Sequence, residues 1–227
     1  RKIGQMHRTV SGEIRVRIPT GLGHFYLKPL ILEFCKNHPE LQLRLVINDQ
    51  IHDLVASKVD LAIHITSAPL VDHVATKVCG IRWCLVCTPQ YLQQHALHLE
   101  QPADLKQARL IAPLALGQRV EFTGPGGAGK VLVQHGASIQ SGDYQFLFNA
   151  ASQGLGIALL PSYAVCEALK RGDLVRVLQR YEVMGIGNAL YVVRASNRQP
   201  SAATVAFIDL LTTSVRAMAP HWDLHDA

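Results

Sequence analysis

The spacing of apolar residues changes once near the start of the chain, and that change predicts the first structural unit. Ile14, Val16 and Ile18 alternate with two arginines, the pattern of a strand with one buried face. A Pro-Thr-Gly turn at residues 19–21 follows, and from residue 27 to residue 34 the apolar positions recur at helical spacing. A strand, a tight turn and a long helix form the opening half of a βαβ unit.

The turn between this strand and helix is the first candidate binding position. Free backbone N–H groups and the positive end of the helix dipole favour an anion or a carboxylate at a helix start. We expect the hydroxyl of Thr20 at the N-cap, where it caps the helix, binds a ligand or does both. Pro29 lies inside the apolar period, so the helix either bends there or has an irregular first turn.

Two more strands are expected before residue 67, at residues 41–48 and 59–63, with a short helix at residues 50–59 between them. Two consecutive β-α-β steps imply a parallel sheet covered by helices. Ligands of such sheets bind beyond the carboxyl ends of the strands. This rule brings to one edge Pro19, Thr20, Gly21, Asn48, Asp49, His64, Ile65 and Thr66.

The rest of the chain also alternates between strand-like and helix-like stretches. Residues 119–135 combine two strand-like runs with a glycine-rich turn, which predicts a β-hairpin. Asp143 is expected to cap the next helix. Other strands are expected within residues 74–87, 109–115, 156–161, 174–178 and 188–194, and other helices at 90–94, from 102, at 144–153, 162–171 and 200–218.

Three cysteines have the C-x4-C-x2-C spacing of some iron–sulfur proteins: Cys79, Cys84 and Cys87. Residues 82–87 have the pattern of a strand, in which Cys84 and Cys87 point to opposite faces. The five cysteines are therefore interpreted as reduced, structural thiols. His95 and His98 have no third ligand nearby, so no zinc site and no cofactor are expected.

A second motif lies at residues 124–130, which match the G-x-x-x-x-G-K pattern of phosphate-binding loops. That loop needs a helix after the lysine and a Ser or Thr hydroxyl for magnesium. Val131 stands at the hydroxyl position, and Val131 to Val133 favour a strand. A hairpin turn is therefore preferred over a nucleotide site.

Composition and charge argue against a nucleic-acid-binding surface and against a membrane protein. The chain of 227 residues is 48% hydrophobic, and its formal charge of +5 is scattered rather than clustered. This distribution gives no nucleic-acid footprint. We expect no membrane helix and no signal peptide, and therefore a cytoplasmic location.

Five stretches, taken together, carry a family resemblance. They are SGEIRVRIPTGLG, LEFCKNHPELQLRLV, HDLVASKVDLAIHI, LVCTPQYL and SGDYQFLFNAASQGLGIALLPSYAVCEALKRGDLVRVL. The chain resembles the effector-binding domain of LysR-type transcriptional regulators from Ser11 to about Met218. The most specific piece is QGLGIALLP at residues 153–161 followed by GDLV at residues 172–175.

The resemblance implies an α/β fold of the two-lobed, type 2 periplasmic-binding-protein-like kind. Each lobe is a mixed sheet flanked by helices, and two crossover strands join the lobes. The expected division is the end of a linker helix at residues 1–11, lobe I at residues 12–87 and 188–219, lobe II at residues 88–187, and a tail at residues 220–227. The N-terminal winged helix-turn-helix that such regulators use to bind DNA is missing from this chain.

The resemblance also assigns a site between the lobes for a small, carboxylate-bearing effector such as an organic acid or an amino acid. The first lobe contributes the strand-edge residues given above. His64 stands where several relatives have arginine, so a bound anion is less secure and affinity is expected to vary with pH. The second lobe contributes Ala112, Pro113 and Leu114 at a strand end and Asp143, Tyr144 and Phe146 at a helix start.

Simpler interpretations of these residues stay open. Thr20 can act as a cap alone, and His64 can be a structural histidine. Asp143 is favoured as a plain N-cap over a ligand-binding residue. Tyr144 and Phe146 belong either to the core or to the cleft wall.

Three functional classes follow from these observations. The favoured class is a ligand sensor, not an enzyme, in which effector binding shifts the arrangement of the lobes and so modulates DNA binding and transcription. A free-standing solute-binding protein and a small-molecule enzyme are the alternatives, and no Ser-His-Asp order or nucleophile elbow supports the enzyme.

The expected partners are the effector and, through the missing N-terminal domain, DNA, with no membrane partner. The resemblance implies a homodimer of this domain and a homotetramer of the full protein. The domains are expected to pair head to tail through the helix around residues 27–34 and the helix that follows the glycine motif of the second lobe. Replacing Ile31 by Asp is expected to give monomers.

Overall fold

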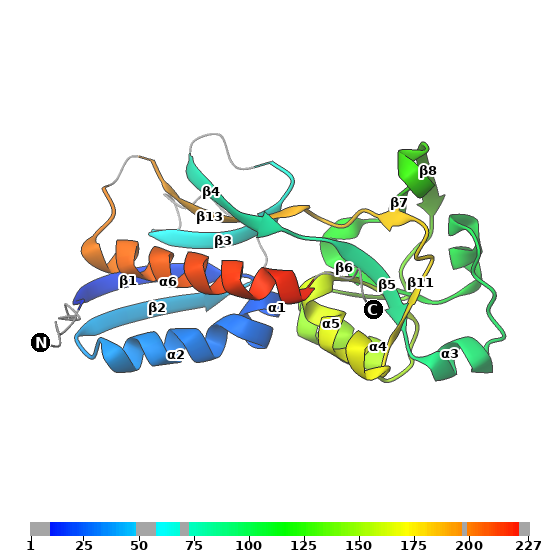
Figure 1. The fold of residues 1–227 in the computed structure, drawn as a ribbon, viewed down its shortest axis with the longest axis horizontal. Helices are drawn as coiled ribbons and strands as arrows, with labels where there is room; N and C mark the ends of the chain where they lie inside the picture. The colour runs from blue at the N-terminus through cyan, green and yellow to red at the C-terminus, as the bar shows by residue number, and fades with distance from the viewer. Residues whose placement is uncertain (1–9, 49–57, 69–72, 197–198, 223–227) are drawn as a thin grey trace, which may run out of the picture.

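The computed structural model describes residues 10–48, 58–68, 73–196 and 199–222, and it contains two sheets flanked by helices. The molecule is elongated, with the first sheet at one end and the second sheet at the other (Figure 1). Buried apolar side chains from the strands and helices of both halves form one main hydrophobic cluster. The expected α/β fold with two mixed sheets is confirmed.

The first sheet has the order β2-β1-β3-β13-β4. β1 pairs in parallel with β2 and β3, and β13 runs antiparallel to β3 and β4. The predicted parallel start is therefore confirmed, whereas the helix expected at residues 50–59 lies almost entirely outside the described residues. The strands are β1 (Gly12–Ile18), β2 (Leu41–Ile47), β3 (Leu61–Thr66), β4 (His73–Gly80) and β13 (Ala189–Ala195).

The long helix after β1 is irregular, as Pro29 predicted. It begins as α1 (Thr20–Leu22), widens into the π-helical turn η1 (Gly23–Leu27) and continues as α2 (Lys28–Asn37). Lys28 N–H donates to the Gly23 carbonyl, five residues back. Proline has no N–H to donate, so a regular α-helical hydrogen bond is lost at this point.

The second sheet has eight strands in the order β8-β7-β12-β5-β10-β6-β9, with β11 paired to β5. Its strands are β5 (Trp83–Cys87), β6 (Leu110–Pro113), β7 (Arg119–Thr123), β8 (Lys130–Gln134), β9 (Ile139–Ser141), β10 (Ile157–Pro161), β11 (Val175–Val177) and β12 (Glu182–Val183). Its helices and 3-10 turns are α3 (Pro89–Gln94), η2 (Pro102–Gln107), η3 (Leu114–Leu116), η4 (Pro125–Gly127), α4 (Tyr144–Ser152) and α5 (Ser162–Arg171).

The boundary between the halves differs from the expected one. β5 lies within the range 12–87 assigned to the first lobe, but it pairs with β10, β11 and β12 of the second sheet. The chain crosses between the sheets after β4 and again before β13, and Ile81 N–H donates to the Asn188 carbonyl at 2.8 Å. We therefore propose that the first lobe ends near residue 80.

The glycine-rich segment is a hairpin turn, as predicted. β7 and β8 are antiparallel, with Thr123 opposite Lys130. Gly126, Gly127 and Gly129 have φ values of 65°, 81° and 65°, a region that glycine adopts readily. A strand rather than a helix follows Lys130, so the segment lacks the geometry of a phosphate-binding loop.

The cysteines of the iron–sulfur-like spacing are divided between two sheets. Cys79 lies in β4, whereas Cys84 and Cys87 lie in β5. Burial raises the pKa of the Cys84 and Cys87 thiols to about 12, so both are protonated at neutral pH. Protonated thiols in a packed strand fit the structural role.

The last helix packs across the first half of the molecule (Figure 1). α6 (Ala202–Met218) buries Phe207, Leu211 and Val215 and continues into the 3-10 turn η5 (Ala219–Trp222). By length and hydropathy, residues 202–222 reach the range of a membrane span, contrary to the expectation from sequence. Because α6 contacts β1 and β4, we interpret it as the core helix of a globular domain.

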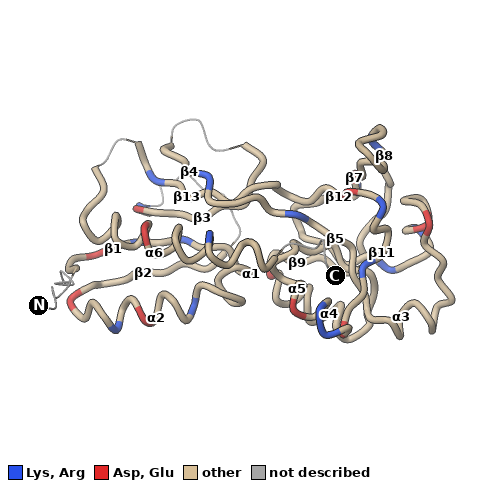
Figure 2. The backbone as a smooth tube through the Cα atoms, viewed as in Figure 1, with Lys and Arg blue, Asp and Glu red and all other residues tan. Residues whose placement is uncertain are grey.

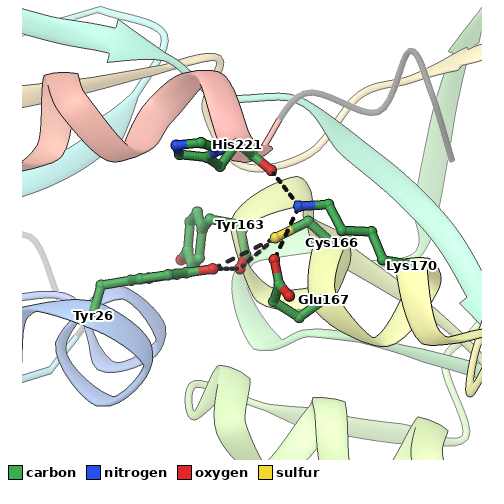
Figure 3. Close-up of polar contacts among 6 residues, drawn as sticks. All are labelled: Tyr26, Tyr163, Cys166, Glu167, Lys170 and His221. Carbon is green, nitrogen blue, oxygen red and sulfur yellow. Dashed lines mark hydrogen bonds and ion pairs between the residues drawn. The ribbon is translucent and has the colours of Figure 1, made fainter.

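Helices from the two halves also contact each other directly (Figure 3). The Tyr26 hydroxyl on η1 donates to the Tyr163 carbonyl on α5 at 2.8 Å. Trp222, which is buried, packs with its ring centroid 5.1 Å from that of Tyr26 and 5.7 Å from that of Tyr163. Lys170 on α5 donates to the His221 carbonyl at 3.4 Å. Residues 220–222, which were assigned to the C-terminal tail, thus contact both halves.

We predict that replacing Tyr26 by Phe lowers the free energy of unfolding by about 1 kcal/mol, because one partly buried hydrogen bond is lost. Trp222→Ala should lower it by about 3 kcal/mol or more through loss of packing. Urea denaturation measures both. Tyr181→Phe is the control, since no hydrogen bond of the Tyr181 hydroxyl is found among the described residues; an equal loss in that variant would contradict the role of the Tyr26 contact.

Candidate functional site

A cleft of about 720 Å³ lies between the two halves, at the carboxyl edge of the parallel strands. This volume is within the usual range of small-molecule sites. The first half supplies the ends of β1, β2 and β3, and the second half supplies the end of β6, the turn after β9 and the start of α4. The lining residues are Pro19, Thr20, Asn48, Ile63, His64, Ile65, Pro113, Leu114, Ala115, Ser141, Gly142, Tyr144 and Ile186.

Eight of the residues predicted from the sequence are brought together in this cleft. The carboxyl-edge rule was effective because β1, β2 and β3 are parallel neighbours whose ends meet at one edge. Whether these side chains bind a ligand stays a prediction. The eight are Pro19, Thr20, Asn48, His64, Ile65, Pro113, Leu114 and Tyr144.

Five predicted residues do not line the cleft. The Thr66 hydroxyl donates to the Ala68 carbonyl at 2.9 Å, within its own turn. Ala112 is fully buried, and Phe146 is 52% exposed outside the cleft. Asp143 caps its helix, and Gly21 packs against Tyr144 and Tyr163. Asp49 lies outside the described residues.

Five lining residues were missed: Ile63, Ala115, Ser141, Gly142 and Ile186. Ser141 ends β9, a three-residue strand that pairs in parallel with β6, so its end lies at the same edge as Pro113. The carboxyl-edge rule would have found Ser141 and Gly142 if so short a strand had been recognised. Ile186 lies on a crossing segment, for which the local sequence carries no signal.

Thr20 links the two walls of the cleft. Its hydroxyl donates to the Gly142 carbonyl at 3.2 Å and accepts the Tyr144 N–H at 3.4 Å. The expected N-cap role is wrong, because Pro19 is the N-cap and Thr20 is the first helical residue. Thr20 therefore acts across the cleft rather than along its own helix.

The start of α4 already carries a carboxylate. Asp143 is the N-cap, as predicted, and its Oδ1 accepts the backbone N–H groups of Gln145 at 2.9 Å and Phe146 at 3.3 Å. These groups are the ones that would attract an anion to a helix start. A ligand carboxylate thus has to find its partners elsewhere in the cleft.

His64 is neutral at physiological pH. It is 7% exposed, and burial lowers its pKa to about 4, with the charges of Arg17 and His73 acting in the same direction. Any pH-dependent affinity that arises from His64 is therefore expected in the acidic range.

Several buried polar atoms near this edge have no hydrogen-bond partner among the described residues. They include Nε2 of His64 and Oδ1 of Asn48, both in the cleft wall, and Nε and Nη1 of Arg17 on β1. Arg17 is only 5% exposed. Buried polar atoms are normally hydrogen-bonded, so this corner is suited to a polar ligand group.

The described part of the cleft wall carries no charged side chain. Among the lining residues that the structure describes, none is Lys, Arg, Asp or Glu. Charged residues are spread over both halves of the described chain rather than collected at one place (Figure 2). Apolar side chains of isoleucine, leucine and proline make up much of the cleft surface.

Comparison with known proteins identifies a consistent group of relatives. Residues 7–216 match the family model of the LysR substrate binding domain. The chain is 28% identical over 221 residues to "Probable HTH-type transcriptional regulator LtrA" of Klebsiella pneumoniae, covering 95% of this chain and 70% of the relative. It is 27% identical to "HTH-type transcriptional regulator PtxR" of Pseudomonas aeruginosa, covering 88% of this chain and 64% of the relative.

Solved structures show the same fold. The full-length virulence activator AphB of Vibrio cholerae superimposes with a TM-score of 0.77 and 24% identity, covering 91% of this chain and 69% of AphB. The CrgA regulatory domain of Neisseria meningitidis superimposes with a TM-score of 0.75 and 18% identity, covering 90% of this chain and 98% of that domain.

We predict that His64 makes stability fall on acidification. Its pKa is lower in the folded chain than the ordinary value of 6.5, so between pH 6.5 and about 4 the unfolded chain binds a proton that the folded chain does not. Each unit of pKa difference corresponds to about 1.4 kcal/mol.

Urea denaturation between pH 7 and pH 5 should therefore show a smaller loss of unfolding free energy in His64→Gln than in the original chain. The exposed His24 supplies the control, His24→Gln. If His64→Gln and the original chain lose equal stability over this range, the low pKa of His64 is wrong.

Proposed function

The chain belongs to the LysR substrate-binding domain family, the regulatory domains of LysR-type transcription regulators, and on this premise we propose that it binds a small effector in the cleft between its lobes. The family is not enzymatic. Binding would modulate how a longer regulator acts on DNA through a separate N-terminal domain. The similarity to HTH-type regulators favours this role over a free-standing solute-binding protein.

One observation carries the proposal. The cleft is walled by both halves of the chain, and it holds buried polar atoms of Asn48 and His64 that lack partners among the described residues. A folded chain leaves such atoms unpaired at a cost in free energy. A ligand that supplies the missing hydrogen bonds recovers that free energy and contacts both lobes at once.

Contact with both lobes is what allows a ligand to regulate. A ligand shifts a conformational equilibrium only through different affinities for the two arrangements. The hydroxyl of Thr20 joins the lobes at Gly142 and Tyr144, beside the cleft. A ligand seated there favours the arrangement in which these contacts and its own are made together.

The proposed effector carries a carboxylate. Arg17, next to His64 and buried, is the cation that supports this choice, because its Nε and Nη1 atoms have no hydrogen-bond partner among the described residues. Two buried guanidinium donors without hydrogen bonds are unfavourable, and an anion in the adjacent cleft reduces that cost. The effector acts in the cytoplasm, where LysR-type regulators contact DNA.

The domain is also proposed to pair with a second copy through the first long helix. The predicted test by Ile31→Asp is unsuitable, because Ile31 is 2% exposed and packs in the core of its own lobe. Leu32, next to it on α2, is 61% exposed and faces outward. An apolar residue this exposed fits a contact surface between copies.

We predict that a thermal-shift screen of carboxylates, amino acids and aromatic acids yields a compound that stabilises the chain. Thr20→Val should weaken that compound about tenfold, because it removes a hydroxyl from the cleft wall. Thr123→Val, in the hairpin strand β7, is the matched control and should leave affinity unchanged. If the compound binds Thr20→Val and Thr123→Val with equal affinity, the binding site does not include Thr20.

We predict that Leu32→Asp shifts the domain to monomers in sedimentation velocity, because a charge is placed in the proposed contact. Leu132→Asp is the control, since Leu132 lies on the distant hairpin and is exposed to a similar degree, 60% against 61%. A dimer mass that Leu32→Asp leaves unchanged would exclude this part of α2 from the interface.

A further inference from the structure

Resting on the proposed effector site, we propose that the effector is a monocarboxylic acid with an apolar, ring-sized body. Its carboxylate lies at the edge of the first sheet, against Asn48 and His64. Its body lies against the second lobe, around Pro113, Leu114 and Ile186. The cleft thereby discriminates against dicarboxylates and against amino-acid zwitterions.

The position of the carboxylate follows from the order of the strands. β1 lies between β2 and β3, so Arg17 on β1 lies between the strand that ends before Asn48 and the strand that carries His64. Asn48 is held by its backbone N–H, which donates to the Ile18 carbonyl at 3.0 Å, and its side chain lines the cleft. The three side chains with unpaired atoms therefore lie on, or directly after, three adjacent strands of one sheet.

These groups are chemically suited to a single carboxylate. A neutral imidazole with its proton on Nε2 donates one hydrogen bond, and an asparagine amide turned to present Nδ2 donates another. The guanidinium of Arg17 supplies one positive charge close to His64. Two neutral donors backed by one cation match one negative charge.

The described part of the cleft wall offers no partner to a second ionised group. Among the described residues that line the cleft none is acidic, so a ligand ammonium finds no carboxylate partner there. The backbone N–H groups at the start of α4 are already bonded to Asp143, so a second carboxylate finds no partner there. Either group would be removed from water without compensation.

The opposite wall is shaped for an apolar body. Pro113 ends β6, Leu114 and Ala115 follow it, and Ile186 on the crossing segment also lines the cleft. Leu114 is 64% exposed, which leaves a large apolar side chain at the cleft wall without cover. The Tyr144 ring packs edge-on against Trp83, with centroids 5.9 Å apart, so it forms a fixed part of the wall.

A panel of similar-sized compounds tests the inference: benzoate and cyclohexanecarboxylate as monocarboxylates, benzamide as the neutral isostere, adipate as a dicarboxylate, and phenylalanine as a zwitterion. Calorimetry and thermal shift on the whole chain give the affinities. The monocarboxylates should bind at least about tenfold more tightly than the other three, the effect of losing one charge-assisted hydrogen bond or leaving one charge unpaired.

Two variants locate the two ends of the ligand. Asn48→Asp keeps the side-chain shape and adds a negative charge at the carboxylate position, so it should weaken benzoate at least about tenfold and weaken benzamide less. Leu114→Asp should weaken both monocarboxylates; because Leu114 is exposed, the fold should tolerate the change. Leu132→Asp, on the hairpin, is the control.

The inference is overturned if adipate or phenylalanine binds as tightly as benzoate, if benzamide matches benzoate, or if Asn48→Asp leaves benzoate affinity unchanged. It is also overturned if no monocarboxylate in the panel binds. The proposed function is tested separately. If a compound of another class binds and its binding depends on Thr20, the effector site is supported and only the monocarboxylate specificity is rejected.

Discussion

The close packing of the first helix against the second lobe fixes the position of the cleft. A Cβ atom at Gly21 would lie 3.0 Å from both the Tyr144 Cβ and the Tyr163 hydroxyl oxygen. Only a residue without a side chain allows the helix this approach at no cost, and the approach brings the Thr20 hydroxyl within reach of Gly142. Without this contact the strand ends of the first sheet would face solvent instead of a second wall.

The sequence predicted the parts of the fold that depend on local pattern. The period-2 run at residues 14–18, the proline in the first helix and the glycine-rich hairpin each lead to a structure through short-range sterics, and each prediction was confirmed. The lobe boundary, expected at residue 87 and proposed here near residue 80, depends on something else. The run through residues 74–87 gives no local sign of where it leaves one sheet for the other, because that choice is made by distant partners such as β10.

The same distinction between local pattern and distant packing explains which residues of the candidate site were predicted. The strand-end residues of the first sheet were found because parallel pairing aligns strand ends, a rule that can be read from pattern. Phe146 was placed in the site by its position near a helix start, yet the helix turns it outward, where it is 52% exposed. The direction of a side chain depends on how α4 is rotated about its axis against the sheet. The sequence alone does not tell which of several neighbouring apolar residues of α4 faces the cleft.

The buried polar atoms without partners at the edge of the first sheet are the atoms that a ligand would stabilise by hydrogen bonding. Arg17, Asn48 and His64 lie on one side of the cleft, and Thr20 holds the other side through Gly142 and Tyr144. At a second place, Tyr26 and Trp222 join the lobes by hydrogen bonding and ring packing. Interlocked aromatic rings resist sliding, because sliding would open a void. The proposed ligand contacts would therefore be added beside a junction that side-chain packing already holds.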